Sequence, residues 1–225
     1  MCSGGAEKVT LELIKALASN DIDFEIILIS KQGGLLTEVP NNVKLIDLNN
    51  SNLFYVLITL IRYFNKRKPY ALIAAIWPLT FISSLAKTLS ISKSCLLSVE
   101  HTTLSVQYAS KPRWFRIALQ LSLMISSRLS NVTAAVSLGS AQDLAKLSRI
   151  SVKKVAILHN PIPKARYVCS KELVIADQYW PTPPGNRILY VGSLKEPKNL
   201  RLLLQAFYML SCKSSSLILV GDGPL

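Results

Sequence analysis

Apolar residues in this chain form short runs that alternate with segments of helical periodicity. The run FEIILIS (24–30) has almost no polar face, which is typical of a strand covered on both sides. Further apolar runs of strand length occupy 42–48, 70–77, 94–100, 131–137 and 153–160. Each is short enough for a strand and too short for a helix that packs on its own.

The segments between these runs follow the helical period. In AEKVTLELIKALAS, residues Ala6, Val9, Leu13 and Leu17 would share one face of an amphipathic helix. Helices are also expected at 53–67, where Pro69 follows, at about 79–89 and at 112–129, and after Ser137 as an N-terminal cap. The alternation of strand and helix predicts an α/β fold with parallel sheets and helices on both faces.

A proline-rich stretch without a sustained period divides the chain. Residues 161–184 contain Pro161, Pro163, Pro181, Pro183 and Pro184, which indicates a linker between domains. We therefore expect a first Rossmann-like, doubly wound domain at 1–163, a linker at 164–186, and the beginning of a second such domain at 187–225.

Positive charge is concentrated after residue 50. The chain carries +13 overall; residues 1–50 hold 4 basic and 7 acidic groups, and residues 51–225 hold 22 and 6. This excess favours an anionic partner. Two clusters, RYFNKRK (62–68) and KPRWFR (111–116), allow three interpretations: cations that complement the C-terminal dipole of a helix, contact with an anionic bilayer, or nucleic-acid binding.

Cysteine and histidine usage argues against a metal centre. Cys2, Cys95, Cys169 and Cys212 lie far apart, as in a cytosolic protein with reduced thiols, and the two histidines have no close Cys or His companion. We expect no metal and no cofactor. The uncharged stretch 69–86 contains Pro78 and several hydroxyls, and it is predicted to be a buried strand followed by a helix rather than a membrane span.

Candidate anion-binding residues lie where strands meet helices. Gly4 and Gly5 precede the first helix, where free backbone N–H groups could bind phosphate, although a simple tight turn explains them equally well. In VGSLKEPKN, Gly192 ends a strand, and Lys195 and Lys198 stand at the start of the next helix. These cations suit a diphosphate over the helix terminus; taken alone, they could equally be solvated charges.

Both histidines follow predicted strands. His101 comes after Glu100 at a strand end, where doubly wound sheets bind ligands. It could hydrogen-bond a substrate hydroxyl or phosphate or transfer a proton, or it could anchor its own loop. His159, next to the turn expected at Asn160-Pro161, is interpreted as structural.

Five segments in order resemble the retaining family 4 glycosyltransferases, which have the GT-B fold. They are GGAEKVTLELIKAL, AAVSLGSAQDLAKL, VAILHNPI, YVGSLKEPKNLRLLLQAF and LILVGDGPL. The resemblance covers nearly the whole chain, and the last two segments are its most specific part.

The resemblance implies transfer of a sugar from a nucleotide-sugar donor, without a metal, to a glycan or lipid-linked acceptor in cell-surface polysaccharide or glycolipid synthesis. The donor diphosphate would contact Gly4, Gly5, Gly192, Ser193, Lys195 and Lys198. His101 would lie near the transferred sugar as the catalytic residue, and Asn160 would form the interdomain turn. The family implies a cytoplasmic protein, with peripheral contact to the inner face of the membrane as a further expectation, and no nucleic-acid partner.

Three departures from the family pattern shape these expectations. Ser193 stands where the family commonly has arginine, which leaves Lys195 as the candidate replacement. The family's later glutamate pair and its first strand have no counterpart in the chain. We therefore expect a fragment that is inactive alone, with strand edges exposed where the first strand would pair. The alternative is a split or degenerate subunit that binds an acceptor or partner without donor chemistry.

Overall fold

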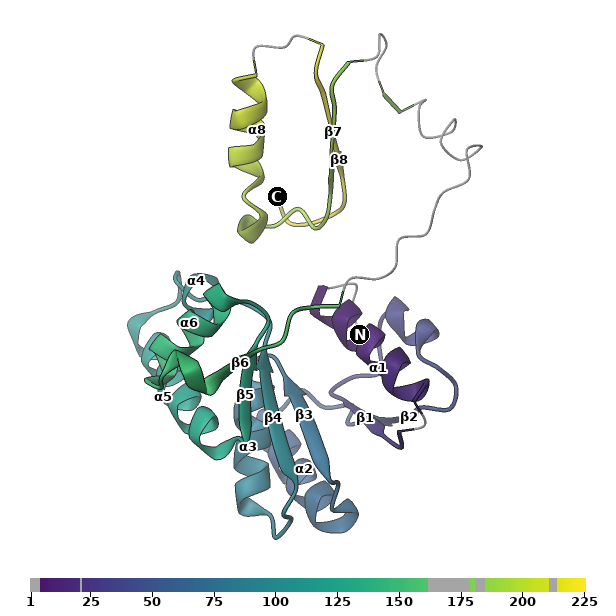
Figure 1. Cartoon of the computed structure of the whole chain (residues 1–225), viewed down its shortest axis with the longest axis vertical. Coiled ribbons are helices and arrows are strands. Elements are labelled where there is room, and N and C mark those ends of the chain that lie inside the picture. The colour runs from purple at the N-terminus through teal and green to yellow at the C-terminus, as the bar shows by residue number, and fades with distance from the viewer. Residues whose placement is uncertain (1–4, 21, 162–178, 181–184, 211–213) are drawn as a thin grey trace. The chain divides into compact units, whose positions relative to one another are not determined.

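The computed structural model describes residues 5–20, 22–161, 179–180, 185–210 and 214–225 (Figure 1). The chain divides into two compact units, residues 1–163 and 164–225, which are described separately. Both contain parallel strands with intervening helices. The predicted α/β fold class is confirmed.

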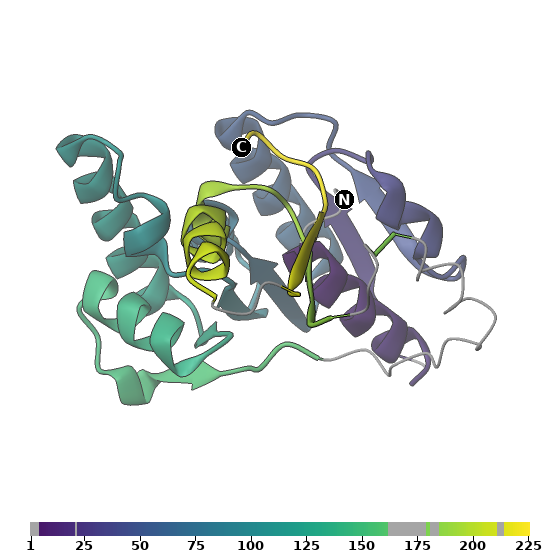
Figure 2. The ribbon, with the colours of Figure 1, turned by 90° about the horizontal axis from the view of Figure 1, so that it is seen from above.

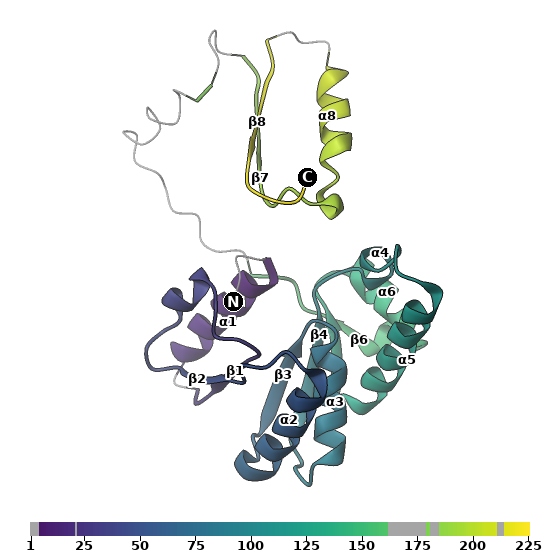
Figure 3. The same ribbon diagram turned by 180° about the vertical axis from the view of Figure 1, so that it is seen from behind.

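A four-stranded parallel sheet forms the centre of the first unit. Its order is β3-β4-β5-β6, so each strand pairs with the next one in the sequence. Parallel neighbours need a crossover connection, which helices supply; Figure 3 shows α2 and α3 beside β3 and β4. The strands are β3 (Ala71–Ala75), β4 (Cys95–Glu100), β5 (Val132–Ala135) and β6 (Val155–Ile157), and the helices are α2 (Leu53–Arg67), α3 (Leu79–Leu89), α4 (Leu104–Gln107), α5 (Arg113–Leu129) and α6 (Leu138–Ser148), with the short 3₁₀ segment η2 (Val152–Lys154) before β6.

The helix boundaries agree closely with the sequence-based expectations, because they are set by local capping chemistry. The Asn52 side chain accepts hydrogen bonds from the backbone N–H groups of Phe54 and Tyr55 at the start of α2. At the start of α6, Ser137 accepts from the backbone of Ser140, whose hydroxyl in turn accepts from the Ser137 backbone. Such reciprocal bonds satisfy N–H groups that the helix itself leaves unpaired.

A separate two-stranded sheet completes the first unit. Strands β1 (Glu25–Leu28) and β2 (Lys44–Asp47) pair in parallel, with the 3₁₀ segment η1 (Gly34–Glu38) between them. Among the described residues, β1 pairs only with β2 and β3 only with β4, so each has one edge without a strand neighbour. The expected interruption of the sheet is therefore confirmed. All four residues of β1 are half-buried, so the strand is less covered than its apolar sequence predicts.

The buried face of α1 (Gly5–Ala18) differs from the predicted one. Leu11 and Ile14 are 2% and 3% exposed, whereas Leu13, placed on the predicted apolar face, is 40% exposed. Leu11 and Ile14 pack with residues of η1 and β2, including Leu35 and Leu45. The prediction was wrong because α1 offers two overlapping apolar faces, and only the neighbours decide which one is covered.

Apolar side chains of the helices and strands form the remaining core of the first unit. One cluster joins α5 and α6 to the sheet through Leu119, Leu123, Ala135 and Leu144. A second joins α2 and α3, and Phe64 at its centre has no exposed surface. No helix within the described ranges is long and apolar enough to cross a membrane.

The second unit contains one parallel strand pair and one helix. Strands β7 (Arg187–Val191) and β8 (Ser216–Val220) pair in register, and α8 (Leu200–Tyr208) lies to one side of them (Figure 2). The 3₁₀ segment η3 (Glu196–Lys198) precedes α8. The helix expected after Lys198 is therefore confirmed as α8, and residues 211–213 lie outside the described part of the chain.

Candidate functional site

The carboxylate of Glu100 anchors the carboxyl ends of β3 and β4. It accepts one hydrogen bond from the Thr80 hydroxyl at 2.7 Å and one from the Trp77 backbone N–H at 3.1 Å. Glu100 is 3% exposed, and this burial raises its pKa above the ordinary value, because desolvation disfavours the charged carboxylate. Glu100 thus binds the turn after β3 to the end of β4.

An aromatic cluster supports this edge of the sheet from the α4–α5 side. The Trp77 indole donates a 2.9 Å hydrogen bond to the Ser122 hydroxyl of α5. The Trp77 ring contacts Tyr108 and Phe115 edge to face, at centroid distances of 5.4 and 5.8 Å. These contacts fix the loop before α5 against the strand ends, so the residues next to Glu100 have rigid support.

His101 lies directly after β4, and one nitrogen of its ring has no hydrogen-bond partner among the described residues. This nitrogen, Nδ1, is buried. Burial lowers the pKa of His101 below 6.5, and the Glu7 carboxylate of α1 opposes part of that shift. The imidazole is therefore neutral at pH 7 and can donate from one nitrogen and accept at the other. His101 thus interacts electrostatically with Glu7, which lies in the first turn of α1.

The glycine loop before α1 is described only in part. Gly4 lies outside the described residues. Gly5 is the first residue of α1, and a Cβ added there would meet no atom within 4 Å. No neighbouring atom in the structure requires glycine at position 5. Its predicted role in phosphate binding stays a prediction.

The other predicted site residues cluster at the carboxyl end of β7 in the second unit. Gly192 and Ser193 directly follow the strand, and the Tyr190 hydroxyl donates to the Ser193 carbonyl at 3.0 Å. Lys195 precedes η3 as its N-terminal cap and Lys198 is the last residue of η3; the Lys198 backbone N–H donates to the Lys195 carbonyl at 2.9 Å. Both lysines are exposed, and neither forms an ion pair with a described residue. Their ammonium groups are available to a bound anion.

Close backbone packing explains the glycines of the LILVGDGPL segment. The Leu194 backbone N–H donates to the Asp222 carbonyl at 2.9 Å, which joins the loops after β7 and β8. A Cβ on Gly221, whose φ is 152°, would lie 1.9 Å from the Gly192 carbonyl oxygen, and one on Gly223 would lie 2.1 Å from the Leu194 oxygen. Glycine at both positions thus lets the β8 loop support the lysine-bearing loop.

The segment after β6 carries the predicted interdomain residue. His159, Asn160 and Pro161 are exposed. The expected Asn160-Pro161 turn would continue into residues 162–178, which lie outside the described part of the chain, so it stays a prediction. The role of Asn160 at a domain crossing stays a prediction. Of the four cysteines, Cys95 is a free, half-buried thiol. Cys2, Cys169 and Cys212 lie outside the described part of the chain.

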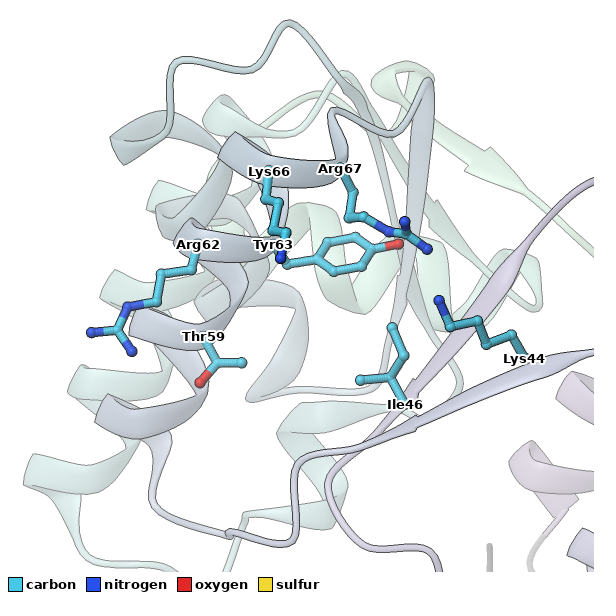
Figure 4. Close-up of a pocket in the computed structure, with 7 residues that line it drawn as sticks. All are labelled: Lys44, Ile46, Thr59, Arg62, Tyr63, Lys66 and Arg67. Carbon is cyan, nitrogen blue, oxygen red and sulfur yellow. The ribbon is translucent and has the colours of Figure 1, made fainter.

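A basic pocket on β2 and α2 was not anticipated from the sequence. It has a volume of about 380 Å³ and is lined by Lys44, Ile46, Thr59, Arg62, Tyr63, Lys66 and Arg67 (Figure 4). Glu25 of β1 pairs with Arg67, with Lys44 at 2.8 Å, and accepts from the Tyr63 hydroxyl at 3.0 Å. Two of the pocket's cations therefore already neutralise a carboxylate, and Figure 4 shows Arg62 pointing away from Tyr63. The Lys44 and Arg67 side of this pocket is therefore a structural ion-pair network with Glu25.

The structure thus places the predicted residues in two groups. Gly5 and His101 belong to the first unit, and Gly192, Ser193, Lys195 and Lys198 belong to the second. Sequence reasoning missed Thr80 and Trp77 as partners of Glu100, because residues 77–80 and 100 are brought together only by the pairing of β3 with β4. Within the described residues, no three His, Cys, Asp or Glu side chains gather in a metal-binding group.

Two solved structures share this fold. The chain matches the apo form of a lipopolysaccharide outer core galactosyltransferase, WaaB, with a TM-score of 0.67 and 15% identity, over 98% of this chain and 58% of that one. It matches Anabaena Alr3699/HepE in complex with UDP and glucose with a TM-score of 0.75 and 14% identity, over 99% and 59%. The chain therefore spans less than two thirds of the length of these proteins.

The family assignment comes from the sequence of the first unit. No match was found among curated proteins. A model of the family described as Glycosyltransferase Family 4 matches residues 3–166, a segment that contains α1, β4 with Glu100 and His101, and the strands through β6. Because this match covers well over half of the sequence, the chain belongs to glycosyltransferase family 4.

Proposed function

We propose that this chain takes part in transferring a sugar from a nucleotide-sugar donor to a glycan or lipid-linked acceptor, with retention at the anomeric carbon. The observation that carries the proposal is His101: a neutral imidazole with an unpaired Nδ1, held at the carboxyl end of β4 in a family 4 glycosyltransferase. Ligands of open α/β sheets bind beyond the carboxyl ends of the strands. We assign His101 a hydrogen bond to the transferred sugar.

The proposed donor half-site is the loop from Gly192 to Lys198. In the reaction the bond between the anomeric carbon and the donor diphosphate breaks, and the acceptor oxygen forms a new bond to that carbon. Negative charge develops on the leaving diphosphate, which Lys195 and Lys198 would neutralise electrostatically. Anabaena Alr3699/HepE, a solved structure of the same fold, was determined with UDP-glucose, which supports a uridine nucleotide as the first donor to test.

The proposed acceptor side is the first unit. There the first turn of α1 with Gly4 and Gly5 would approach the phosphates or the reacting sugar through free N–H groups. A cytoplasmic protein at the inner face of the membrane, acting in cell-surface polysaccharide or glycolipid synthesis, is the context that we propose for a lipid-linked acceptor.

A non-catalytic subunit is the second candidate. The observation that favours it is Ser193, which stands where the family commonly carries a cation, at a position where its carbonyl is held by Tyr190. Such a subunit would bind a partner or an acceptor and would not recognise the donor. Nucleotide binding separates the two candidates.

The test titrates the chain with UDP, UDP-glucose and GDP and follows backbone amide NMR signals. We expect UDP to shift signals in the segment 192–199, and Lys195→Ala combined with Lys198→Ala to weaken binding at least tenfold. The matched control, Lys153→Ala with Lys154→Ala, removes two exposed lysines of η2 and should bind as the wild type does. Absence of any nucleotide-induced shift, together with capture of an acceptor glycan, would favour the non-catalytic subunit. We expect the chain alone to show no donor-dependent transfer of labelled sugar, and transfer that His101→Ala reduces would overturn the expectation that the chain is inactive alone.

A further inference from the structure

Helix α5 carries a second apolar face that nothing in the described structure covers. Trp114, Ile117, Leu121 and Ile125 are 70%, 48%, 52% and 42% exposed. Their spacings of three, four and four residues align them along one side of the helix, over about 16 Å. We call these four residues the α5 outer stripe.

The opposite side of α5 is the one that packs. Leu119 and Leu123 are 2% and 1% exposed and belong to the core cluster with α6 and the sheet. Helix α5 packs between α3 and α6 on that side, and Figure 1 shows it beside α6. Since one apolar face already holds α5 in the fold, the outer stripe is not needed for packing within the described unit, and a contiguous exposed apolar patch of this kind marks an interaction site.

Cations surround the N-terminal end of the stripe. Lys111, Arg113 and Arg116 are exposed, and none of them forms an ion pair with a described residue. Residues 101–142 contain no acidic side chain. The nearest acidic residue in the sequence, Asp143 of α6, accepts a 3.1 Å hydrogen bond from the Ser105 backbone. The surface around the stripe is therefore positive.

The helix dipole does not account for these cations. In the cluster 62–68, Lys66 and Arg67 occupy the last turn of α2 and Lys68 is its C-terminal cap, where a dipole interpretation holds. Arg62 lies more than one turn earlier. In the cluster 111–116 the basic residues stand at the start of α5, where the N-terminal end of the dipole repels positive charge. An external anion near these cations would offset this unfavourable interaction.

We infer that the α5 outer stripe docks on the surface of an anionic bilayer, with the helix axis in the membrane plane. Apolar side chains on one face, an aromatic residue at the end and flanking Arg and Lys are the features of interfacial helices. On the helical wheel Arg113 lies next to the stripe, and its side chain is long enough to reach lipid phosphates while Trp114 enters the interface. Arg116 adds positive charge farther round the same flank of the helix. A second copy of the chain is a poorer occupant, because it would bring the same three cations together.

This inference rests on the membrane contact within the proposed function and assigns it to a defined helix face. Its test measures vesicle binding, so it can fail while nucleotide binding and sugar transfer stand, and it can succeed if they fail. The substituted side chains lie outside the residues assigned to donor and acceptor chemistry.

The experiment uses flotation of the whole chain with vesicles of phosphatidylcholine alone or with 30% phosphatidylglycerol. We expect binding to the anionic vesicles only. Ile117→Ser with Leu121→Ser should weaken it at least tenfold, whereas Leu202→Ser, which removes a 57% exposed leucine from α8, should not. Arg113→Gln with Arg116→Gln should weaken it about fivefold per cation, and Lys153→Gln with Lys154→Gln is the control of equal charge loss.

The folding of each variant and the insertion of Trp114 into the bilayer are checked on the same samples. Circular dichroism identifies any variant that has lost helix content, and quenching of wild-type tryptophan fluorescence by brominated lipid, absent in Trp114→Phe, reports insertion without disturbing the stripe. The inference is overturned if Ile117→Ser with Leu121→Ser floats as the wild type does. It is also overturned if the wild type binds neutral and anionic vesicles equally. It is equally overturned if the wild type binds no vesicle but forms a dimer that Ile117→Ser with Leu121→Ser dissociates.

Discussion

The Thr80 hydroxyl donates a 2.7 Å hydrogen bond to the carboxylate of Glu100, which is almost fully buried at the end of β4. The two residues lie 20 positions apart and meet because β3 and β4 pair in parallel, so that the first turn of α3 lies over the end of the neighbouring strand. The same carboxylate accepts from the Trp77 backbone. Glu100 therefore organises the strand ends next to His101.

Removing the Glu100 carboxylate should destabilise the first unit strongly, whereas neutralising it should not. Glu100→Ala leaves the Thr80 hydroxyl and the Trp77 N–H without a buried partner, and we expect a loss of about 2–3 kcal/mol. Glu100→Gln can accept from Trp77 and donate to Thr80, so its stability at pH 7 should equal or exceed that of the wild type. Urea unfolding followed by circular dichroism measures both variants.

The pH dependence of that comparison gives an independent check. Burial raises the folded-state pKa of Glu100, so its ionisation opposes folding. The wild type should therefore lose stability relative to Glu100→Gln as the pH rises above about 4.5, the ordinary value. If the wild type instead gained stability relative to Glu100→Gln as the pH rose, the charged form of the carboxylate would be the stabilised one.

Glu25 should make the first unit sensitive to acid. Its hydrogen bonds with Arg67, Lys44 and Tyr63 lower its pKa to about 2. The stability from this network is present above the unfolded-state value near 4.5 and is lost as the pH falls toward 2. Glu25→Gln should cost about 1 kcal/mol at pH 7, since the Lys44 and Arg67 side chains are about half exposed and screened by solvent.

Urea unfolding between pH 2 and 6 tests this expectation. The Glu25→Gln variant should show a flatter pH dependence than the wild type. Glu12→Gln is the matched control, because Glu12 forms an exposed pair with Lys15 at 3.3 Å on the surface of α1, and its loss should leave the pH dependence of stability unchanged. Equal flattening in both variants would mean that Glu25 has no special role.

His101 should titrate below 6.5, and Glu7 should control part of the shift. Burial lowers the pKa and the Glu7 carboxylate raises it, so Glu7→Gln should lower the pKa of His101 further. NMR of the imidazole protons of His101 in the wild type and in Glu7→Gln measures the change. Because folding favours the neutral imidazole, the chain should lose stability as the pH falls below 6.5, and His101→Gln should remove that component. An unchanged His101 titration in Glu7→Gln would show that α1 does not act on it.

Gly221 should tolerate no side chain. Gly221→Ala would place a Cβ 1.9 Å from the Gly192 carbonyl at a positive φ, and we expect a loss of at least about 2 kcal/mol in the second unit. Hydrogen exchange of the Gly192 and Leu194 amides, which donate to Val220 and Asp222, reports that loss locally. Gly139→Ala in α6, where an added Cβ meets nothing within 4 Å, should leave stability unchanged or raise it by up to about 1 kcal/mol. Unaltered exchange in Gly221→Ala would contradict the packing argument.

The sequence by itself determined the strand and helix order, the ends of α2, α3 and α6, and the placement of Lys195 and Lys198 between a strand and a helix. These features depend on hydrophobic period, capping side chains and turn residues, all of which act within a few positions of the chain. The family motifs added the glycosyltransferase assignment for the same reason, since each motif is a local run of residues.

Only the tertiary structure decided which surfaces are covered and which distant residues meet. It brought Thr80 and Trp77 to Glu100, paired Glu25 with Lys44 and Arg67, and buried Leu11 rather than Leu13 on α1. It also left the α5 outer stripe uncovered, although the 112–129 segment predicts one amphipathic helix. Burial and long-range pairing depend on neighbours that parallel crossovers bring together. A local pattern of apolar and polar residues does not specify which distant residues those neighbours are.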